Sequence, residues 1–557
     1  MAELFTSKAR MTARKTGLES LRSKHMDDWK KITQVIRPER GLYIESSDTE
    51  QSKRPTSMIN STPAVASRTL SSGMISGASS PAYEWFKFIL DDEDIAKWGP
   101  VKQNLETRER IMRTHLARSN FYQQLEILYG DAADFGTGFG IIEPHPTQIF
   151  AVKLFAIGQY LIQHNALGDI DTVYAFDWLT TLDIMSRWKD KASVMVKQAY
   201  DKGDYNAKFR VWYVIEPNQV QDSSALWRGK PWVKFVFEES NTVEGEAGFL
   251  EISGYNEWPG FDLRWRVGAG NVWGSGCGSL ALGDAASLQT YEFRDAQAVE
   301  KGVKPSLKAP IFLKNKPINQ AAGGVTYYDP YTANNSDVSP IYQISPGILG
   351  AIANRITDIE RRINEVYYKD LFLMLATSDR REITAREVEE KHSEKLLALG
   401  PVLQRTHRDT LDNALARVYR MLDAASAFPP APDEFKNRAI GPRYTSALAY
   451  AQRAAGAASI ERFFGFLGNL APSFPKVSFK VNAFKGIDHY ADAIGVPAEV
   501  MVDDETAQAE FDQMQQAQAA PDQAAALQSA AQSAELLSRT DTTRPSALSF
   551  LLQRAGG

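Results

Sequence analysis

The sequence predicts an α+β protein that is mostly helical, and three observations lead to this prediction. All 11 tryptophans lie between Trp29 and Trp273. Between about residues 140 and 265, turn residues separate short stretches rich in Val, Phe, Tyr and Trp, which is typical of strands. After Gly274 helix-forming residues dominate, and residues 505–557 are rich in Ala and Gln. The pattern therefore predicts a mixed α/β body followed by a helical half.

Length, charge and hydropathy limit the class of protein. A chain of 557 residues and 62.0 kDa fits roughly two to four structural units, and 43% hydrophobic with 24% charged residues is ordinary for a globular protein. The formal net charge of −5 argues against a protein that coats itself with nucleic acid through bulk electrostatics. No apolar run approaches the ~18 residues of a membrane span, and we expect no secretory signal.

The residue types that usually carry catalysis or bind metals form no recognisable constellation. The single cysteine, Cys277, excludes an intramolecular disulfide framework and a multi-cysteine metal site, and it fits a reducing compartment. Seven histidines are scattered without an HExxH spacing, and no P-loop or G-x-S-x-G motif is present. We therefore expect no enzyme, no cofactor and no metal, and we interpret Cys277 as inert packing.

Three helices are predicted before the strands. The first covers about residues 17–36, where apolar side chains recur on one face. The second begins at Thr62-Pro63, with Thr as the cap and Pro at the first helical position. Its small residues permit close packing and predict a buried helix. The third covers about residues 101–119.

Strands are predicted where aromatic and β-branched residues cluster between turn residues. Their spacing predicts an antiparallel or mixed sheet, with room for helix between the first two strands. The predicted strands are 172–176, 209–215, 232–237 and 250–255.

The second half is predicted to contain two long helices around a proline-rich insertion. The first long helix covers about residues 279–301, and the insertion covers residues 305–345. Ser345-Pro346 then opens a helix of about 30 residues, roughly 45 Å long, by the cap-then-proline rule. One apolar stripe runs along it from Ile348 to Val366, opposite a charged face.

A polar break and further helices follow. After the break at residues 377–382, Thr384-Ala385-Arg386-Glu387 matches a capping box, and the helix that it opens is predicted to end at Gly400-Pro401. Another helix reaches about Ala425 before a stiff Pro-rich linker at residues 428–432. The last helices are predicted at 446–469, 486–494 and, within the Ala/Gln tract, 506–539.

Four short motifs have simple structural interpretations. Gly136–Gly140 lacks the strand-then-helix context of a nucleotide loop and predicts a turn. Gly274–Gly278 predicts a flexible hinge ahead of a helix. The acidic run 91–94 predicts a solvated loop. The N-terminal basic residues lack interleaved aromatics, and we interpret them as a solvated tail rather than a nucleic-acid contact; they are Lys8, Arg10, Arg14 and Lys15.

Four stretches together resemble the portal (head-to-tail connector) proteins of short-tailed bacteriophages, the podovirus type. They occur in the order seen in that family and span about residues 17–500, whereas the Ala/Gln tail is not characteristic. The most specific runs from Thr384 through Gly400-Pro401 to Leu403. The other three are Trp29–Gly41, the small-residue helix running into Ser80–Phe86, and Tyr444–Gln452.

The resemblance implies a portal-like architecture for the segments predicted above. An α/β wing, a two-helix stem, a small clip insertion between the stem helices, a tunnel loop and a helical crown are expected. The implied divisions are 1–275 (body or wing), 276–304 (first stem helix), 305–345 (clip), 346–376 (second stem helix), 377–383 (tunnel loop), 384–435 (helices on the wing and crown side), 436–504 (crown) and 505–557 (tail, a barrel helix or disordered).

The resemblance also implies candidate residues for the channel. The tunnel-loop candidates are Thr377, Ser378, Asp379, Arg380, Arg381 and Glu382, and for Arg380 and Arg381 an exposed loop with surface ion pairs is an equally good interpretation. The stem candidates lie on the charged face of the second helix: Arg355, Asp358, Arg361, Arg362 and Glu365.

The function implied by the resemblance is a ring, of twelve subunits in most members, at one capsid vertex. Double-stranded DNA enters and leaves the head through its axial channel. The implied partners are other copies of the chain, major capsid and scaffold proteins, terminase during packaging, and tail or adaptor proteins afterwards. The implied location is the virion, with the host cytoplasm during assembly.

Two other interpretations of the sequence remain open at this stage. One is an oligomeric virion structural or scaffold protein without a DNA channel. The other is a cytosolic enzyme whose site is spread over loops, against which the lack of a catalytic constellation counts weakly. A DNA-binding regulator fits least well, because the charge is acidic and no DNA-reading motif is present.

Overall fold

The structure is a computed structural model, and it divides into two compact units, Met1–Gln452 and Arg453–Gly557. In the second unit the described residues include helical segments at 463–470 and 485–487. All elements below belong to the first unit. The described residues are 7–40, 58–90, 99–219, 227–308, 339–340, 345–377, 398–432, 440–445, 463–470, 474, 482, 485–487, 490, 507 and 509.

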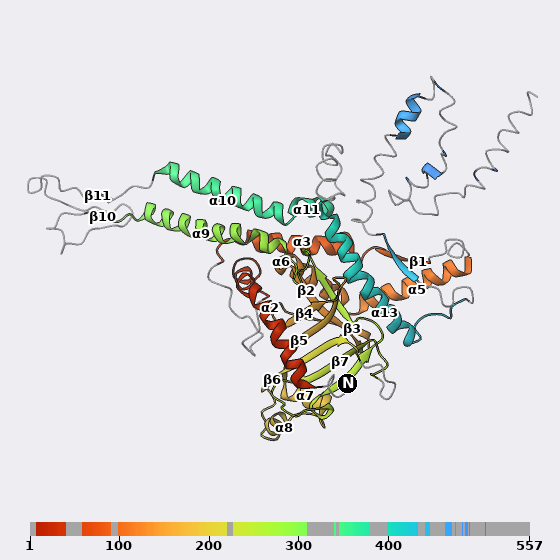
Figure 1. Ribbon diagram of the computed structural model, residues 1–557. Helices are drawn as coiled ribbons and strands as arrows, with labels where there is room; N and C mark the ends of the chain where they lie inside the picture. Colours follow the sequence, from red (N-terminus) through yellow and green to blue (C-terminus); the bar gives the residue numbers. More distant parts are fainter. Residues whose placement is uncertain are drawn as a thin grey trace, which may run out of the picture. The chain divides into compact units, whose positions relative to one another are not determined.

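A five-stranded antiparallel sheet forms one layer of the body, in the order β4-β5-β6-β7-β8 (Figure 1). Each strand pairs with its neighbours in sequence, and the helices α7 (Thr181–Trp188) and α8 (Val194–Asp201) lie between β5 and β6 in the chain. The sequence predicted an antiparallel or mixed sheet, and the sheet is antiparallel throughout. The strands are β4 (Tyr160–His164), β5 (Ile170–Thr180), β6 (Lys208–Pro217), β7 (Trp232–Glu238) and β8 (Glu251–Tyr255).

Both faces of this sheet are buried. Successive side chains of a strand point to opposite sides, so each strand contributes side chains to the packing on both faces. Tyr174 and Phe176 of β5 join a cluster with Met11 and Leu18 of helix α2 (Lys8–Val35). The alternate β5 residues, such as Val173, join the main core on the other face. Helix α2 therefore covers one face of the sheet, as Figure 1 shows in red.

Helix α2 begins earlier than predicted, and the basic residues at its start are not a solvated tail. Arg10 and Arg14 both bind the buried carboxylate of Glu216 on β6, with 2.7 Å between Arg14 Nη1 and Glu216 Oε2. Lys15 Nζ lies 2.8 Å from Glu239 Oε1, and Lys8 Nζ donates to the carbonyl oxygen of Asn241 at 2.9 Å. These pairs attach α2 to the sheet, which no local pattern revealed.

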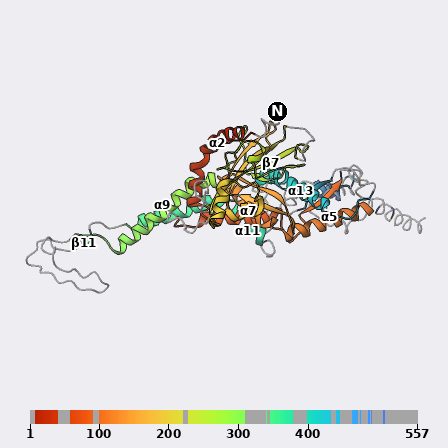
Figure 2. The same ribbon diagram turned by 90° about the horizontal axis from the view of Figure 1, so that it is seen from below.

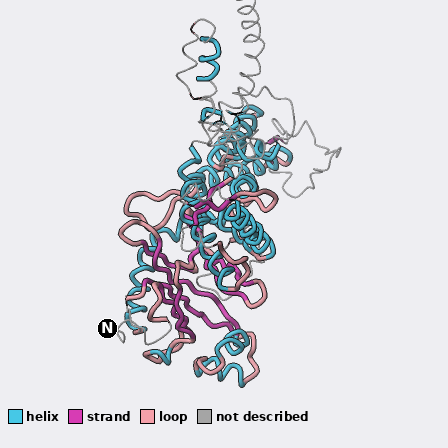
Figure 3. The backbone as a smooth tube through the Cα atoms, turned by 90° about the vertical axis from the view of Figure 1, so that its right-hand side faces the viewer, coloured by secondary structure: helices cyan, strands magenta, loops and turns pink. Residues whose placement is uncertain are grey.

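A second, three-stranded antiparallel sheet has the order β3-β2-β9, and its strand β3 contacts β5 of the first sheet; Figure 3 draws the strands of the body in magenta. Its strands are β2 (Thr137–His145), β3 (Ile149–Phe155) and β9 (Gly260–Arg264). Helix α6 (Phe121–Phe135) leads directly into β2 through Gly136, whose φ of +85° suits glycine. The predicted turn at Gly136–Gly140 is therefore confined to Gly136, and the rest of the motif is strand.

The other predicted helices of the N-terminal half are present. Helix α3 (Thr62–Ala78) has Ser61 at its N-cap, so Thr62 is the first helical residue rather than the cap. It is buried along one face and close-packed as predicted, since Gly73 lies against the ring of Phe372. Helix α5 (Gly99–Arg118) corresponds to the third predicted helix.

Two strands far apart in sequence pair with each other. β1 (Phe86–Leu90) and β12 (Ile440–Tyr444) form an antiparallel pair in which Phe86 lies opposite Tyr444. A single-turn 3₁₀ helix, η1, spans Glu246–Gly248 between β7 and β8. Neither partner of the β1–β12 pair was predicted as a strand.

The helix predicted to end at Gly400-Pro401 continues through both residues. Residues 398–405 are helical, followed by the π-helical segment η3 (Thr406–Asp412) and helix α13 (Asn413–Ala424). Leu399, Val402 and Leu403 are buried, so tertiary packing overrides the local preference of Gly and Pro. The Pro-rich segment that follows is docked on the body, because Arg108 Nη2 donates to the carbonyl of Pro429 at 2.9 Å.

The second half of the body contains the predicted pair of long helices. Helix α9 spans Cys277–Val303 and helix α10 spans Pro346–Val366. A shorter helix, α11 (Lys369–Thr377), follows α10. The single helix predicted over 346–376 is thus broken at Tyr367 and Tyr368, and Tyr368 has a φ of +52°.

The α+β class with dominant helix is confirmed for the part of the chain that the structure describes. Its helices include none that is long and apolar enough to cross a membrane. Several predictions lie outside the described residues: the acidic loop 91–94, the capping box 384–387, most of the helices predicted over 446–494, and the helix predicted over 506–539 apart from residues 507 and 509.

Candidate functional site

Helices α9 and α10 form an antiparallel hairpin that extends away from the body of the first unit (Figures 1 and 2). At the end near the body, Ala285 and Leu288 of α9 and Ile359 and Ile363 of α10 are buried. Coverage of the predicted apolar stripe decreases outward along α10, because Ile352 and Ile356 are half-buried and Ile348 at the far end is 56% exposed. The hairpin therefore shares the core of the body at one end and meets solvent at the other.

Large apolar side chains are exposed along the outer part of α9. Phe293 is 47% exposed, Val299 49% and Val303 73%. Single exposed apolar residues are normal on a protein surface, but several on one projecting hairpin mark a surface suited to contact with another protein.

The five candidate residues on α10 divide into two groups. Arg362 binds Asp284 of α9 through two hydrogen bonds, with Nη2 2.6 Å from Oδ1 and Nε 3.2 Å from Oδ2. This bidentate pair fixes one helix to the other. Arg361 lies 3.5 Å from Asp358 and 3.9 Å from Glu365, and all three side chains are more than half exposed.

The exposed pairs of Arg361 therefore contribute little stability, because solvent screens them. Arg355 lies on the exposed face as well. The structure thus brings Arg361 together with Asp358 and Glu365, and it places Arg362 toward α9 instead. Four charged residues on the outer face remain available for contacts beyond this chain.

The predicted insertion between the helices is closed at its base by a short strand pair. β10 (Leu307–Lys308) and β11 (Ser339–Pro340) are antiparallel, with Leu307 opposite Pro340. Residues 309–338 and 341–344 lie outside the described residues. Among the tunnel-loop candidates only Thr377 is described, as the last residue of α11, and Ser378, Asp379, Arg380, Arg381 and Glu382 also lie outside.

The start of α9 is a close-packed joint, where the sequence predicted a flexible hinge. A Cβ atom on Gly276 would overlap the carbonyl oxygen of Ala133, and one on Gly278 would overlap that of Asp134. The amide of Gly274 donates to Thr137 Oγ1 at 3.0 Å. Glycine is needed here because two backbone segments touch, and the helix is held rather than hinged.

Cys277, the first residue of α9, lies inside this joint. Its side chain is 2% exposed, and burial raises the pKa of the thiol to about 12. A thiol with so high a pKa is protonated at neutral pH and unreactive. The interpretation of Cys277 as inert packing fits this geometry.

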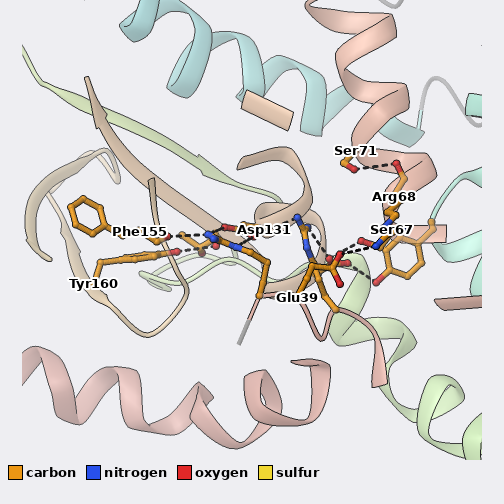
Figure 4. A network of polar contacts seen from close by, with 12 residues as sticks. Glu39, Ser67, Arg68, Ser71, Asp131, Phe155 and Tyr160 are labelled. Atoms are coloured by element: carbon orange, nitrogen blue, oxygen red, sulfur yellow. Dashed lines mark hydrogen bonds and ion pairs between the residues drawn. The ribbon is translucent and has the colours of Figure 1, made fainter. Parts of the chain in front are cut away.

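The end of α10 is anchored on the same segment of α6 through a buried polar network (Figure 4). Asp134 is fully buried, and it accepts hydrogen bonds from Tyr367 Oη at 2.8 Å, Ser67 Oγ at 2.7 Å and Arg37 Nη1 at 3.1 Å. Burial raises the pKa of Asp134, and the Arg37 charge and the hydrogen bonds oppose that shift. The carboxylate thus ties α10 to α3 and to the segment that follows α2.

A second carboxylate extends the network toward β3. Asp131 accepts from Arg40 Nε at 3.0 Å and from Arg40 Nη2 at 2.6 Å, and Arg40 also donates to the carbonyl of Phe155 at 3.4 Å. Figure 4 shows these groups beside the more exposed pair of Arg68 and Glu39, 3.7 Å apart. Arg37 Nη2 also lies 3.9 Å from Asp131 Oδ1, so three arginine–aspartate pairs hold the segment after α2 in place.

A third contact clamps both helices of the hairpin at once. Asn60, just before α3, donates through Nδ2 to Glu292 of α9 at 2.7 Å and to Glu360 of α10 at 2.8 Å. Gln289 of α9 accepts from the amides of Ile59 at 2.7 Å and Asn60 at 2.8 Å. The hairpin is therefore fixed to the body at three places.

These anchoring residues were missed by the sequence analysis. Asp131 and Asp134 are acidic residues in the otherwise apolar helix α6, and that pattern is the available signal of a buried polar site. Arg37 and Arg40 lie just after the first predicted helix, and no local pattern assigned them a buried contact. Within the described residues, no group of three or more His, Cys, Asp or Glu side chains is placed to hold a metal ion.

Comparison with known proteins gives a family for this chain. The family model described as bacteriophage head to tail connecting protein matches residues 8–502. The portal protein of Salmonella phage epsilon15 is 33% identical over 561 residues, which cover 100% of this chain and 99% of that protein. The probable portal protein of Bordetella phage BPP-1 is 31% identical over 542 residues, 97% of each chain.

Among solved structures, a chain from the virion of a native gene transfer agent particle matches with a TM-score of 0.33 and 12% identity, over 77% of this chain and 93% of that chain. That similarity is too distant to support an argument. The family model and both relatives, in contrast, cover nearly the whole sequence. The chain therefore belongs to the bacteriophage head-to-tail connecting proteins, the portal proteins.

Proposed function

We propose that this protein assembles into a closed ring, of twelve copies, at one vertex of a phage capsid and conducts double-stranded DNA during packaging and ejection. The observation that carries the proposal is the similarity to the epsilon15 portal protein over the full length of both chains. A hairpin fixed to the body at one end and exposed at the other is the kind of element that such a ring requires.

In this proposal the segments take the roles implied by the family. The body, 1–275, is the wing; α9 and α10 are the stem; 305–345 is the clip; and 377–383 is the tunnel loop. Residues 384–435 and 436–504 form the wing-side and crown helices, and 505–557 form the tail. The strand pair at the base of the insertion supports this division, because β10 and β11 pair with each other between the two stem helices.

The exposed side chains of the hairpin support self-assembly. A ring needs a heterologous interface, in which one face of a subunit meets a different face of the next. Phe293, Val299 and Val303 supply apolar area, and Arg361 with Asp358 and Glu365 supplies charges of both signs on the outer face. We assign these groups to contacts between neighbouring stems or with the channel.

The charge of the chain suits a conduit. Each phosphate neutralised by a cation adds affinity, so a strongly basic channel would hold DNA and oppose its movement. A subunit with a net charge of −5 avoids this, and Arg380 and Arg381 in the proposed tunnel loop would offer brief contacts in each copy.

The proposal assigns a structural rather than catalytic role. The sequence has no P-loop, so ATP hydrolysis would belong to a terminase docked on the clip. Capsid and scaffold proteins would contact the outside of the ring, and tail or adaptor proteins would replace terminase after packaging. The protein would enter the virion from the host cytoplasm.

Negative-stain electron microscopy with native mass spectrometry of the purified full-length chain tests the proposal. Closed rings with an axial hole and a mass near twelve subunits are expected. A particle that stays monomeric or dimeric at micromolar concentration, even with its capsid and scaffold proteins present, would refute the conduit.

A further inference from the structure

A cavity of about 660 Å³ lies in the body. Three segments far apart in sequence line it: the turn between β4 and β5, the loop between β9 and α9, and the helical residues from Pro401 to Asp409. The last segment runs into η3, and π-helical segments often occur at functional sites. The cavity has no role in the anchoring of the hairpin described above.

Three guanidinium groups line this cavity, from Arg264, Arg405 and Arg408. Arg264 is only 5% exposed, and its Nη2 donates to the carbonyl of Gly168 at 2.6 Å. Its Nε is buried and has no hydrogen-bond partner among the described residues. The charges of Asp262 and Asp409 partly offset that of Arg264, but a buried donor without a partner is costly, so Nε of Arg264 suits a site that receives an anionic acceptor.

The carboxylates near the cavity only partly balance these cations. Arg408 Nη2 lies 2.9 Å from Asp169 Oδ1, but the two side chains are 70% and 45% exposed, so the pair is weak and replaceable. Arg405 is half-buried and makes no ion pair with a described carboxylate. Burial and the charge of Asp409 raise the pKa of Asp262 to about 7. Burial also raises the pKa of Asp409, although the charges of Arg264, Arg405 and Arg408 oppose that rise.

We propose that this cavity binds an acidic peptide segment of a partner protein, with Arg405 and Arg264 receiving its carboxylate groups. The guanidinium fork matches a carboxylate through paired hydrogen bonds. The exposed loop at Gly268–Gly270 leaves its main chain open to hydrogen bonds with a peptide backbone. The inference concerns a site on the single chain and does not depend on the ring.

An acidic peptide fits this cavity better than duplex DNA. A duplex carries one charge per ~1.7 Å of its axis on a stiff cylinder, and Asp169 and Asp409 on the lining would repel its neighbouring phosphates. A peptide can place one or two carboxylates at the arginines and turn neutral groups toward these aspartates. A side chain can also enter a recess where a phosphate backbone cannot follow.

The test is fluorescence anisotropy of the full-length protein with a labelled oligo-glutamate peptide. Saturable binding is expected, and Arg405→Ala is expected to weaken it about tenfold or more, as the loss of a charge-assisted contact predicts. Arg405→Lys should recover part of the affinity. Arg118→Ala, which removes an exposed arginine of α5 outside the cavity, should leave the affinity unchanged.

Three outcomes would overturn the proposal. The first is the absence of saturable binding, or binding that Arg405→Ala and Arg118→Ala weaken equally. The second is an oligo-glutamine peptide that binds as tightly as oligo-glutamate. The third is complete displacement of the labelled peptide by inorganic phosphate or a short DNA duplex at a lower concentration than unlabelled oligo-glutamate requires. Thermal unfolding of each variant excludes misfolding, and the half-buried Arg405 is chosen over the buried Arg264 for that reason.

Discussion

The hydroxyl group of Tyr367 donates a hydrogen bond of 2.8 Å to Oδ1 of Asp134, and both side chains are fully buried. The backbone of the same aspartate touches Gly278 near the start of α9. One residue of α6 therefore contacts the beginning of one hairpin helix through its main chain and the end of the other through its side chain. Movement at this point would be passed to both helices together.

Tyr367→Phe is expected to destabilise the protein by about 1–3 kcal/mol, because it removes one donor from a buried carboxylate. The free energy of unfolding from urea denaturation measures the effect. Tyr291→Phe is the matched control, since Tyr291 on α9 is 36% exposed, and its effect should stay within about 0.5 kcal/mol. Equal effects of the two variants would contradict the anchoring role of Tyr367.

Gly278→Ala is expected to destabilise the joint by about 1–3 kcal/mol, because the new Cβ would overlap the carbonyl oxygen of Asp134. Gly283→Ala, one and a half turns further along α9, has nothing within 4 Å of the new Cβ. It should be neutral or stabilise by roughly 0.5–1 kcal/mol, as Ala does within helices. We expect the thermal unfolding temperature to fall in Gly278→Ala and to stay or rise in Gly283→Ala. An unchanged unfolding temperature in Gly278→Ala would mean that the start of α9 is a hinge.

Glu216→Gln is expected to destabilise the body by about 1–3 kcal/mol, because Glu216 is buried and receives both Arg10 and Arg14 from α2. Limited proteolysis should then cut within α2 earlier than in the unchanged protein. Glu246→Gln removes an exposed partner of Arg228 and should have little effect. A resistant α2 in the Glu216 variant would show that apolar contacts alone hold it.

Glu109 is expected to make stability depend on pH. It is buried and accepts a hydrogen bond from the amide of Phe88 at 2.7 Å, and burial raises its pKa from 4.5 to about 7. The folded state therefore binds this proton more tightly than the unfolded state does. The stability that results is complete below pH 4.5 and is lost as the pH rises to about 7.

Glu109→Gln should remove this loss. The difference in unfolding free energy between the variant and the unchanged protein should increase from pH 4.5 to pH 7 by about 1–3 kcal/mol, in favour of the variant. Glu106→Gln, an exposed position on the same helix, serves as the control and should follow the unchanged protein. A constant difference across this pH range would contradict the buried proton.

Replacing Phe293 and Val299 together by Ser is expected to reduce ring formation while leaving the subunit folded. Both side chains are about half exposed in the single chain, so their loss removes little from its core. Native mass spectrometry should show monomers in place of closed rings. Tyr83→Ser, at a 77% exposed position of the body, should assemble normally, and rings of unchanged yield in the double variant would move the proposed interface away from the hairpin.

Local patterns in the sequence predicted the positions of many helices and strands of this protein. The cap-then-proline signal at Ser345-Pro346 marked the start of α10, and clustered β-branched and aromatic residues marked β5 to β8 within a few residues. These signals depend on neighbours along the chain, as caps and strand preferences do. The resemblance to portal proteins likewise followed from residues in order, and the comparisons confirm the family.

Only the tertiary structure decided how these pieces are joined. Tyr367 meets Asp134 across 233 residues, and Arg10 meets Glu216 across 206, so no window of sequence could pair them. The end of α10 at Tyr367, and the continuation of a helix through Gly400-Pro401, depend on such distant contacts and run against local preference. The sequence by itself determined the long helices, the strands β5 to β8 and the family, because those are properties of short segments and their order. The contacts that anchor the hairpin and the cavity lined by arginines form only on folding. Folding buries charged groups that are remote in sequence, and each buried charge then requires an oppositely charged or hydrogen-bonding partner.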